Sequence, residues 1–383
     1  MTLAISVFIT MVLTTLGLLS LFLYWRFVAA FPDASTTVRL ALGAALVFLA
    51  LGRFISVAVE KTGAYQLAEV LKVTTEIWLV MQFWFLVAAG VLLLWNLAVK
   101  GIAMAAPGSS QLLVPPRASF LTAVSLIALA SIWGWFEASA IKVETVTVTV
   151  KDLPQGMDKL RVAQISDLHI GAFRSSQRLA RAVELVQELK PDMIVSTGDL
   201  LDTRYESIAH HARVLALLNA PLGKFAVKGN HEFYSGGEGS VRFHEEAGFV
   251  LLRGTSAEPL PGLKVVGVDD PAGARFGQTG HLEEHKVLTA SPRSALVLFL
   301  KHQPTIERGS LSLFDLQLSG HTHGGQVFPF GFVTRMVYRY GPGLHELDGG
   351  ARLYVSRGTG TWGPPLRLMS PPEVTLIEFV KGD

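Results

Sequence analysis

The hydrophobic positions divide the chain into two parts. Four apolar runs of 19 to 23 residues fill the first third of the sequence. A helix needs about 20 such residues to cross ~30 Å of hydrocarbon. Trp25, Arg26, Trp133 and Trp135 flank the runs, as is typical of residues at a membrane–water interface. The pattern therefore predicts a transmembrane domain over residues 1–137, with about four helices at 3–24, 40–59, 77–99 and 118–136.

One charge interrupts the apolar runs, and the loop charges favour one orientation. Arg53 lies near the end of the second run, where we interpret it as a snorkelling side chain; a functional intramembrane charge is the alternative. The basic residues on one side of the membrane are Arg26, Arg39, Lys100 and Arg117, against Lys61 and Lys72 on the other. The positive-inside rule then predicts that both termini and the second part of the chain face outward.

The second part, residues 138–383, has the pattern of an α/β domain. Strand-like runs at 161–166, 192–197 and 224–228 alternate with helical spacing at 175–190 and 207–218. Further strand-like runs occur at 142–150, 264–268, 295–301, 315–319, 352–356 and 374–380. Few helices separate the later runs, so we expect part of the sheet system to be antiparallel or mixed.

Charge and cysteine content narrow the function classes. The first 137 residues hold 7 basic and 5 acidic side chains, and the remaining 246 hold 26 of each. This balance excludes a broad electrostatic attraction to nucleic acid, so no nucleic-acid partner is expected. The chain has no cysteine, which excludes disulfides, thiolate metal sites and a cysteine nucleophile.

Polar residues follow five of the predicted strands. They are Asp167 and His169, then Asp199 and Asp202, then Asn230 and His231, then His302, and finally His321 and His323. Ligands of α/β sheets bind outside the carboxyl ends of the strands, so these distant residues are expected to converge. Imidazole and carboxylate groups suit Mn, Fe or Zn. The set exceeds the needs of one ion, and two ions sharing a carboxylate would use it well, as in the hydrolysis of phosphoesters.

The order and spacing of these groups resemble a known family. Asp-x-His, Gly-Asp-x-x-Asp, Gly-Asn-His-Glu, a later His and Gly-His-x-His match the calcineurin-like metallophosphoesterases over about 155 residues. The run from Gly320 to Gln326, with the tail from Tyr354 to Glu373, is similar to the membrane-anchored bacterial branch, which includes UDP-2,3-diacylglucosamine pyrophosphatase-like phosphodiesterases. The resemblance implies a two-sheet sandwich flanked by helices, in a multi-pass protein of the bacterial cell membrane.

The resemblance also implies a role for each matching residue. Asp167, His169 and His323 would bind one divalent metal ion, Asn230, His302 and His321 the other, and Asp199 both. His231 would contact the phosphate and protonate the leaving oxygen, and Asp202 would hold His231. The implied enzyme is a phosphoric ester hydrolase that cleaves a phosphodiester, phosphomonoester or pyrophosphate bond by attack of a metal-bound hydroxide.

The segment 328–340 is rich in aromatic residues and holds Arg335 and Arg339. Because it follows His323 closely, we expect it to present a lipid-linked or envelope substrate, with the two arginines binding phosphate. An ordinary strand and hairpin packed in the core is the alternative.

The sequence leaves alternative functions and alternative roles of single residues open. The alternative function is a metal-binding sensor or regulatory membrane protein without turnover; a transporter is disfavoured because the spans hold few polar residues. Glu232 either orients a neighbouring group or is solvated, and Asp269-Asp270 suggests a turn.

Overall fold

The computed structural model describes residues 2–171, 173, 175–278, 283–290 and 294–382. The chain divides into two compact units, Met1–Trp133 and Gly134–Asp383. The division falls inside the fourth long helix, slightly earlier in the chain than the boundary at residue 137 that the apolar pattern predicts.

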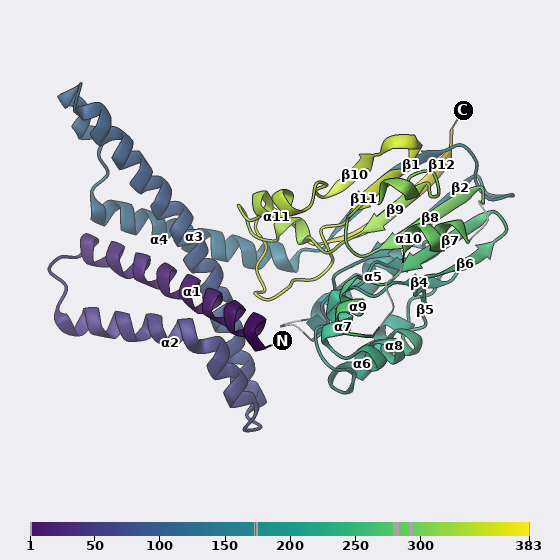
Figure 1. The fold of residues 1–383 in the computed structure, drawn as a ribbon, viewed down its shortest axis with the longest axis horizontal. Coiled ribbons are helices and arrows are strands. Elements are labelled where there is room, and N and C mark those ends of the chain that lie inside the picture. The colour runs from purple at the N-terminus through teal and green to yellow at the C-terminus, as the bar shows by residue number, and fades with distance from the viewer. Residues whose placement is uncertain (1, 172, 174, 279–282, 291–293, 383) are drawn as a thin grey trace. The chain divides into compact units, whose positions relative to one another are not determined.

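The first unit consists of long apolar helices (Figure 1). They are α1 (Thr2–Ala30), α2 (Thr36–Glu60), α3 (Tyr65–Ala103), the short 3₁₀ helix η1 (Pro107–Leu112) and most of α4 (Pro116–Ser139). All four α-helices are long and apolar enough to cross a membrane. The helix α3 begins well before the apolar run at residue 77, because the polar turns after Tyr65 are helical too. The apolar run predicts the bilayer-spanning part of a helix and not its ends.

Close packing inside the first unit depends on small and aromatic side chains. A side chain at Gly52 of α2 would collide with Thr75 of α3. Phe85 is buried, and its ring centroid lies 5.5 Å from that of Phe120. Arg53 donates a hydrogen bond to the Ser56 hydroxyl of its own helix (3.2 Å).

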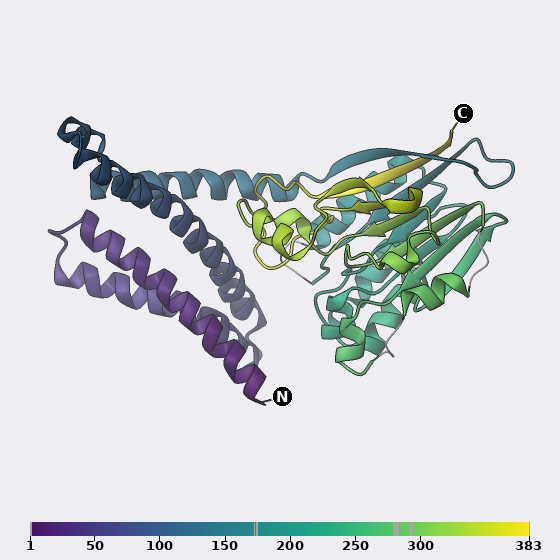
Figure 2. The same ribbon diagram turned by 45° about the horizontal axis from the view of Figure 1, so that its top comes forward.

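The second unit contains two six-stranded mixed sheets (Figure 2). The first sheet has the order β1 (Lys142–Val150), β12 (Glu373–Lys381), β2 (Lys159–Ile165), β3 (Met193–Ser196), β4 (Lys224–Ala226) and β5 (Val250–Leu251). The second has the order β10 (Gly343–Glu346), β11 (Arg352–Val355), β9 (Leu316–Ser319), β8 (Leu296–Lys301), β7 (Leu263–Val268) and β6 (Thr255–Leu260). The predicted α/β class and the mixture of strand directions are confirmed.

Three apolar layers hold this unit together. Val162, Val195, Leu298 and Leu318 belong to a buried cluster contributed by both sheets, which therefore pack face to face. The outer face of the first sheet packs on α5 (Ser175–Leu189), α6 (Tyr205–Ala216) and α8 (Gly237–Glu246). The outer face of the second sheet packs on α10 (Glu284–Thr289). The remaining helices are the short segments α7 (Asn230–Tyr234), α9 (Ala272–Arg275), α11 (Gly331–Val337) and the 3₁₀ turns η2 (Arg308–Ser310), η3 (His323–Gly325) and η4 (Asp348–Gly350).

The strand directions place the candidate residues together. Strands β2, β3, β4 and β5 run parallel, as do β7, β8, β9 and β11. The loops that follow these parallel strands carry the candidate residues, and they meet at one edge of the sandwich.

Candidate metal centre

Several of the converging side chains sit on strained backbone. Asp167, His169, Asp199, His321 and His323 all have positive φ angles, between 49° and 71°. Left-handed backbone is costly for residues with a Cβ and clusters at functional sites. Two glycines allow the close approach: a side chain at Gly229 would collide with Asp199, and one at Gly320 with Asp167. The backbone is therefore shaped around the carboxylates.

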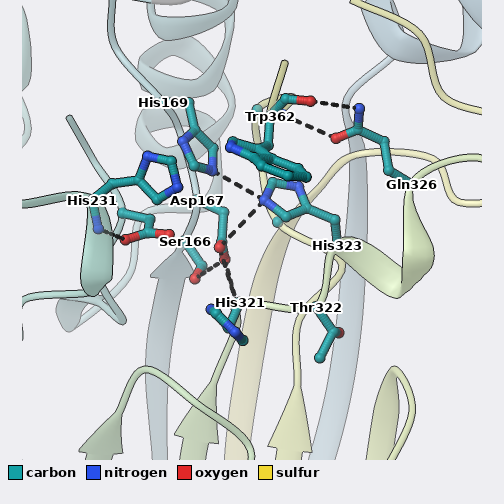
Figure 3. A network of polar contacts seen from close by, with 12 residues as sticks. Ser166, Asp167, His169, His231, His321, Thr322, His323, Gln326 and Trp362 are labelled. Carbon is teal, nitrogen blue, oxygen red and sulfur yellow. Dashed lines mark hydrogen bonds and ion pairs between the residues drawn. The ribbon is translucent and has the colours of Figure 1, made fainter. Parts of the chain in front are cut away.

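The first group of possible ligands comprises Asp167, His169 and His323 (Figure 3), whose ligand atoms all lie within 4.8 Å of one another. The two histidine Nε2 atoms are 3.0 Å apart, and Asp167 Oδ1 is 3.5 Å from His323 Nε2. Burial and the neighbouring charges of His169 and Arg367 lower the pKa of His323 well below its ordinary value. His323 is therefore neutral, as a metal ligand must be.

The second group comprises Asp199, His302 and His321, and Asn230 joins it. The Nδ1 of His302 lies 2.8 Å from the Thr197 carbonyl, which can only accept, so Nδ1 carries a proton. The Nε2 of His302 faces His321 Nδ1 at 3.0 Å, Asp199 Oδ2 at 3.2 Å and Asn230 Oδ1 at 3.2 Å. If His302 is neutral and His321 carries its proton on Nε2, all four atoms offer lone pairs to one point.

The charges around the Nε2 atom of His302 favour a positive charge there. Although burial opposes it, Asp199 and Asp167 raise the pKa of His302 well above its ordinary value. Burial and His302 lower the pKa of His321 to about 4, so His321 remains a neutral donor of electrons. Either a proton on His302 or a cation among the four atoms relieves the repulsion of the lone pairs. The chemistry of these donors fits a divalent metal ion.

Asp199 lies between the two groups. It also belongs to a third group with His169 and His231, again with ligand atoms within 4.8 Å of one another. The geometry alone thus leaves two arrangements around Asp199, and they differ in whether His231 binds metal.

Asp202 accepts hydrogen bonds from two histidines with a single oxygen. Its Oδ1 lies 2.5 Å from His231 Nδ1 and 2.8 Å from His169 Nδ1. Burial opposes the protonation of His231, but the hydrogen bond that its Nδ1 donates to Asp202 and the charge of Asp199 raise its pKa to about 9. His231 is therefore a cation at neutral pH, beside the rings of Tyr234 and Trp362.

Glu232 is fully buried, which excludes the solvated alternative. Its carboxylate accepts backbone N–H bonds from Asp199 (2.9 Å), Leu200 (2.7 Å) and Gly229 (2.8 Å). It fixes the loop that carries Asp199 against the loop that carries Asn230. The expected turn at Asp270 is present too, since its Oδ1 accepts the N–H of Ala272 (2.8 Å).

The sequence patterns did not indicate Arg367, which is completely buried beside the centre. Its guanidinium lies 3.1 Å from His323 Nδ1 and donates to the carbonyls of Arg357 (2.9 Å) and Gly360 (2.6 Å). A single arginine between two leucines of a proline-rich loop carries no local signal of such a position.

The segment 328–340 is neither a strand nor a hairpin. It contains the helix α11, on which Phe332 and Met336 are exposed to 62% and 86%. Arg335 lines a cavity of about 200 Å³ together with Thr322 and Gly324, the neighbours of His321 and His323. Arg339 lines a different cavity of about 390 Å³ that shares Tyr338 and Tyr340 with the first. Of the two predicted arginines, the structure brings Arg335, and not Arg339, to the cavity beside the candidate ligands.

Comparisons with known proteins agree with this picture. The sequence profile of the calcineurin-like phosphoesterases matches residues 160–325. An uncharacterized metallophosphoesterase of Aquifex aeolicus is 40% identical over 247 residues, 64% of this chain and 94% of the relative. An uncharacterized metallophosphoesterase of Bacillus subtilis, YkuE, is 31% identical over 252 residues, 61% of this chain and 85% of the relative. A "transmembrane protein with metallophosphoesterase domain" of Danio rerio is 30% identical over 267 residues, 67% of this chain but only 61% of the relative.

Proposed function

We propose that this chain, which belongs to the calcineurin-like phosphoesterase family and is a metal-dependent phosphoester hydrolase, is a membrane-anchored enzyme with two metal ions. The observation that carries the proposal is the convergence of ligand atoms from separate loops on Asp199. Asp167, His169 and His323 hold one ion, Asn230, His302 and His321 hold the other, and Asp199 is shared.

The metal ions, when bound, neutralise phosphate oxygens and lower the pKa of water enough to give hydroxide near neutral pH. The chain's own residues position the reactants. Glu232 holds the two loops in register through backbone N–H groups, and Asp202 fixes the ring of His169. Outer partners of this kind orient ligands and strengthen metal binding.

His231 supplies the proton for the leaving oxygen in this proposal. Its Nδ1 is held by Asp202, which leaves Nε2 to donate to the substrate, and its side chain is 17% exposed and hence reachable. His169 makes the same contact with Asp202 but its side chain is buried, whereas His231 is the more exposed ring, as a group that reaches a substrate must be. We therefore leave His231 out of the ligand set.

The test is the loss of a ligand without the loss of the fold. Asp199→Ala and Asn230→Ala should each abolish metal-dependent hydrolysis of bis-p-nitrophenyl phosphate by the full-length protein, while membrane insertion is retained. The exposed Asp158→Ala and Asn219→Ala serve as matched controls. Turnover near the wild-type rate in either ligand variant would show that the assignment is wrong. Bound metal without any turnover in the wild type would favour the metal-binding sensor.

A lipid-linked or envelope phosphoester is the proposed substrate. Arg335 lies in the cavity beside His321 and His323, and phenylalanines of the same segment line that cavity too. Guanidinium groups suit phosphate, and apolar walls suit a lipid chain. Monoester, diester and pyrophosphate bonds are all compatible with these contacts, as are Mn, Fe and Zn with the ligands.

The substrate proposal is tested with Arg335→Ala, Arg339→Ala and the double variant, assayed on a lipid phosphoester and on a small soluble diester. We expect a selective loss on the lipid, with Arg335→Ala the more severe single change. The exposed Arg213→Ala of α6 is the control. Equal loss on both substrates, or no loss on either, would contradict a role in lipid selection.

The proposed setting is a multi-pass protein of the bacterial cell membrane with an outward-facing phosphoesterase unit. The four apolar helices and the relative named as a transmembrane protein support membrane association. Because the chain lacks cysteine, Leu217→Cys, which replaces a residue that is 65% exposed, gives a unique label site. Reaction with an impermeant maleimide in intact cells is expected; reaction only after lysis would reverse the orientation.

A further inference from the structure

The last turn of α4 is built into the phosphoesterase unit. The carbonyl of Gly134 accepts the N–H of Arg367 (2.9 Å), and Glu137 Oε1 accepts the N–H of Ser370 (2.8 Å). A Cβ at Gly134 would lie 2.9 Å from the carbonyl oxygen of Arg367, so the contact requires glycine. The loop 360–370 is therefore fastened to the end of a helix that is long and apolar enough to span a membrane.

The same turn indicates where a bilayer would end. Trp135 and Phe136 lie there, and Phe136 is 69% exposed. Such aromatic residues mark the membrane–water interface. The end of α4 therefore suits an interfacial position.

This loop leads directly to the mouth of the metal centre. Leu368 donates its N–H to the Gln326 carbonyl (2.9 Å) and accepts the N–H of Phe328 (3.0 Å). The side chain of Gln326 binds the backbone of Trp362 at both ends, which Figure 3 shows beside His323. Loop 360–370 and the segment before α11 thus form one continuous rim.

The rim is unusually apolar. Its members, which we call the rim surface, are Phe328, Phe330, Phe332, Val333, Met336, Val337, Trp362 and Met369, and each is at least 41% exposed. Elsewhere in the second unit, exposed large apolar residues such as Leu217 and Val250 do not belong to this surface, and Tyr234 and Phe276 form a separate pair whose ring centroids are 5.3 Å apart. A contiguous apolar patch of this kind marks an interaction site.

The charge of the rim identifies the partner. Residues 327–341 hold Arg335 and Arg339 and no acidic residue. In the part of the chain that the structure describes, neither arginine forms an ion pair. Exposed aromatic and aliphatic side chains beside two arginines without ion pairs suit an anionic bilayer surface.

We propose that the rim surface inserts into the interfacial layer of an anionic phospholipid bilayer, so that the mouth of the metal centre faces the lipid head groups. This inference rests on the proposed function, because docking would let a bilayer lipid reach the cavity beside Thr322 and Gly324 without entering water. The rim and the last turn of α4 then contact the same leaflet.

Insertion can be measured without hydrolysis. Met336→Cys, Met369→Cys and the control Leu217→Cys are labelled with an environment-sensitive NBD fluorophore in the full-length protein, reconstituted in vesicles of phosphatidylcholine and phosphatidylglycerol. We expect nitroxide-labelled lipids to quench the two rim labels several-fold more strongly than the label at Leu217. Equal quenching at all three positions, with equal access of aqueous iodide, would overturn the proposal.

A second arm separates docking from catalysis. Met336→Glu, which replaces a residue that is 86% exposed, should lower hydrolysis of a vesicle-borne phosphoester on the order of tenfold or more. Hydrolysis of a soluble diester should be unchanged, and Leu217→Glu should change neither. Equal rates of Met336→Glu and wild type on vesicles would contradict docking. Failure of the wild type on both substrates would instead contradict the proposed function, while the label experiment still decides insertion.

Discussion

Asp202→Asn is the most informative single change at the centre, because one oxygen of Asp202 contacts both the proposed metal ligand His169 and the proposed acid His231. Oδ1 is 2.8 Å from His169 Nδ1 and 2.5 Å from His231 Nδ1, and the side chain is 14% exposed. Asparagine has the same shape and keeps an acceptor oxygen. It removes the negative charge and replaces the second oxygen by an NH2 group.

The structure sets the expected size of the effect. Hydrogen bonds to a charged acceptor are roughly twice as strong as neutral ones, so both contacts weaken without vanishing. Changing an outer partner of a metal ligand costs ~10–100-fold in metal affinity, and we expect the lower end for His169. A positioned acid contributes ~10²–10⁴-fold in rate, and we expect about 10²-fold in kcat for the weakened His231.

The pKa of His231 determines in which direction the pH dependence of kcat should move. The charges of Asp202 and Asp199 raise the pKa of His231 to about 9 against the opposing effect of burial. Removing the charge of Asp202 lowers that pKa, so the acidic form of His231 is lost at a lower pH. If His231 donates the proton, the alkaline decline of kcat must move to lower pH in Asp202→Asn.

The assay is hydrolysis of bis-p-nitrophenyl phosphate from pH 6 to 10 at limiting and at saturating Mn²⁺, with metal affinity measured by calorimetry. Saturating metal should restore only the part of the loss that is due to His169. An unchanged alkaline decline, or full recovery of kcat with metal, would refute the proposed link between Asp202 and His231.

Three further outcomes are expected. His231→Ala should keep both metals and lose rate ~10²–10⁴-fold, whereas His321→Ala should lose metal; elemental analysis beside kcat separates the two, and loss of metal from His231→Ala would reverse the roles. Burial and Asp199 raise the pKa of Glu232 to about 7, so at pH 9 Glu232→Gln should lower the thermal midpoint by weakening backbone contacts to a charged acceptor, worth about 1.5–3 kcal/mol each. An unchanged midpoint at that pH would contradict this structural role. Burial lowers the pKa of His244 to about 4, below its unfolded value, so its contribution to stability is complete above about pH 6.5 and lost as the pH falls toward 4. His244→Asn should therefore reduce the loss of unfolding free energy between pH 7 and 5 by about 2 kcal/mol, measured by denaturant unfolding at both values.

The fold class could be predicted from the sequence because its signals are local. Apolar length predicts the long helices, and alternating periodicities predict the α/β unit. The strands β1 and β12 pair although their first residues, Lys142 and Glu373, are 231 residues apart in the sequence. This pairing depends on tertiary contacts that no local pattern encodes.

The candidate site could be predicted only in part, for a similar reason. Polar residues directly after strands indicate the groups that converge, such as Asp199 and His302. Arg367 lies in a loop without regular structure, and its position depends on carbonyls of another part of that loop. The helix α11 was not expected, because its aromatic sequence resembles a buried hairpin and only its exposure distinguishes it.

The central claim is that two metal ions share Asp199 and exclude His231. Anomalous diffraction from crystals of the Mn²⁺-loaded full-length protein tests it most directly. We predict two peaks that both contact Asp199, one beside Asp167, His169 and His323, the other beside Asn230, His302 and His321. A single peak, or a peak coordinated by His231, would contradict the account.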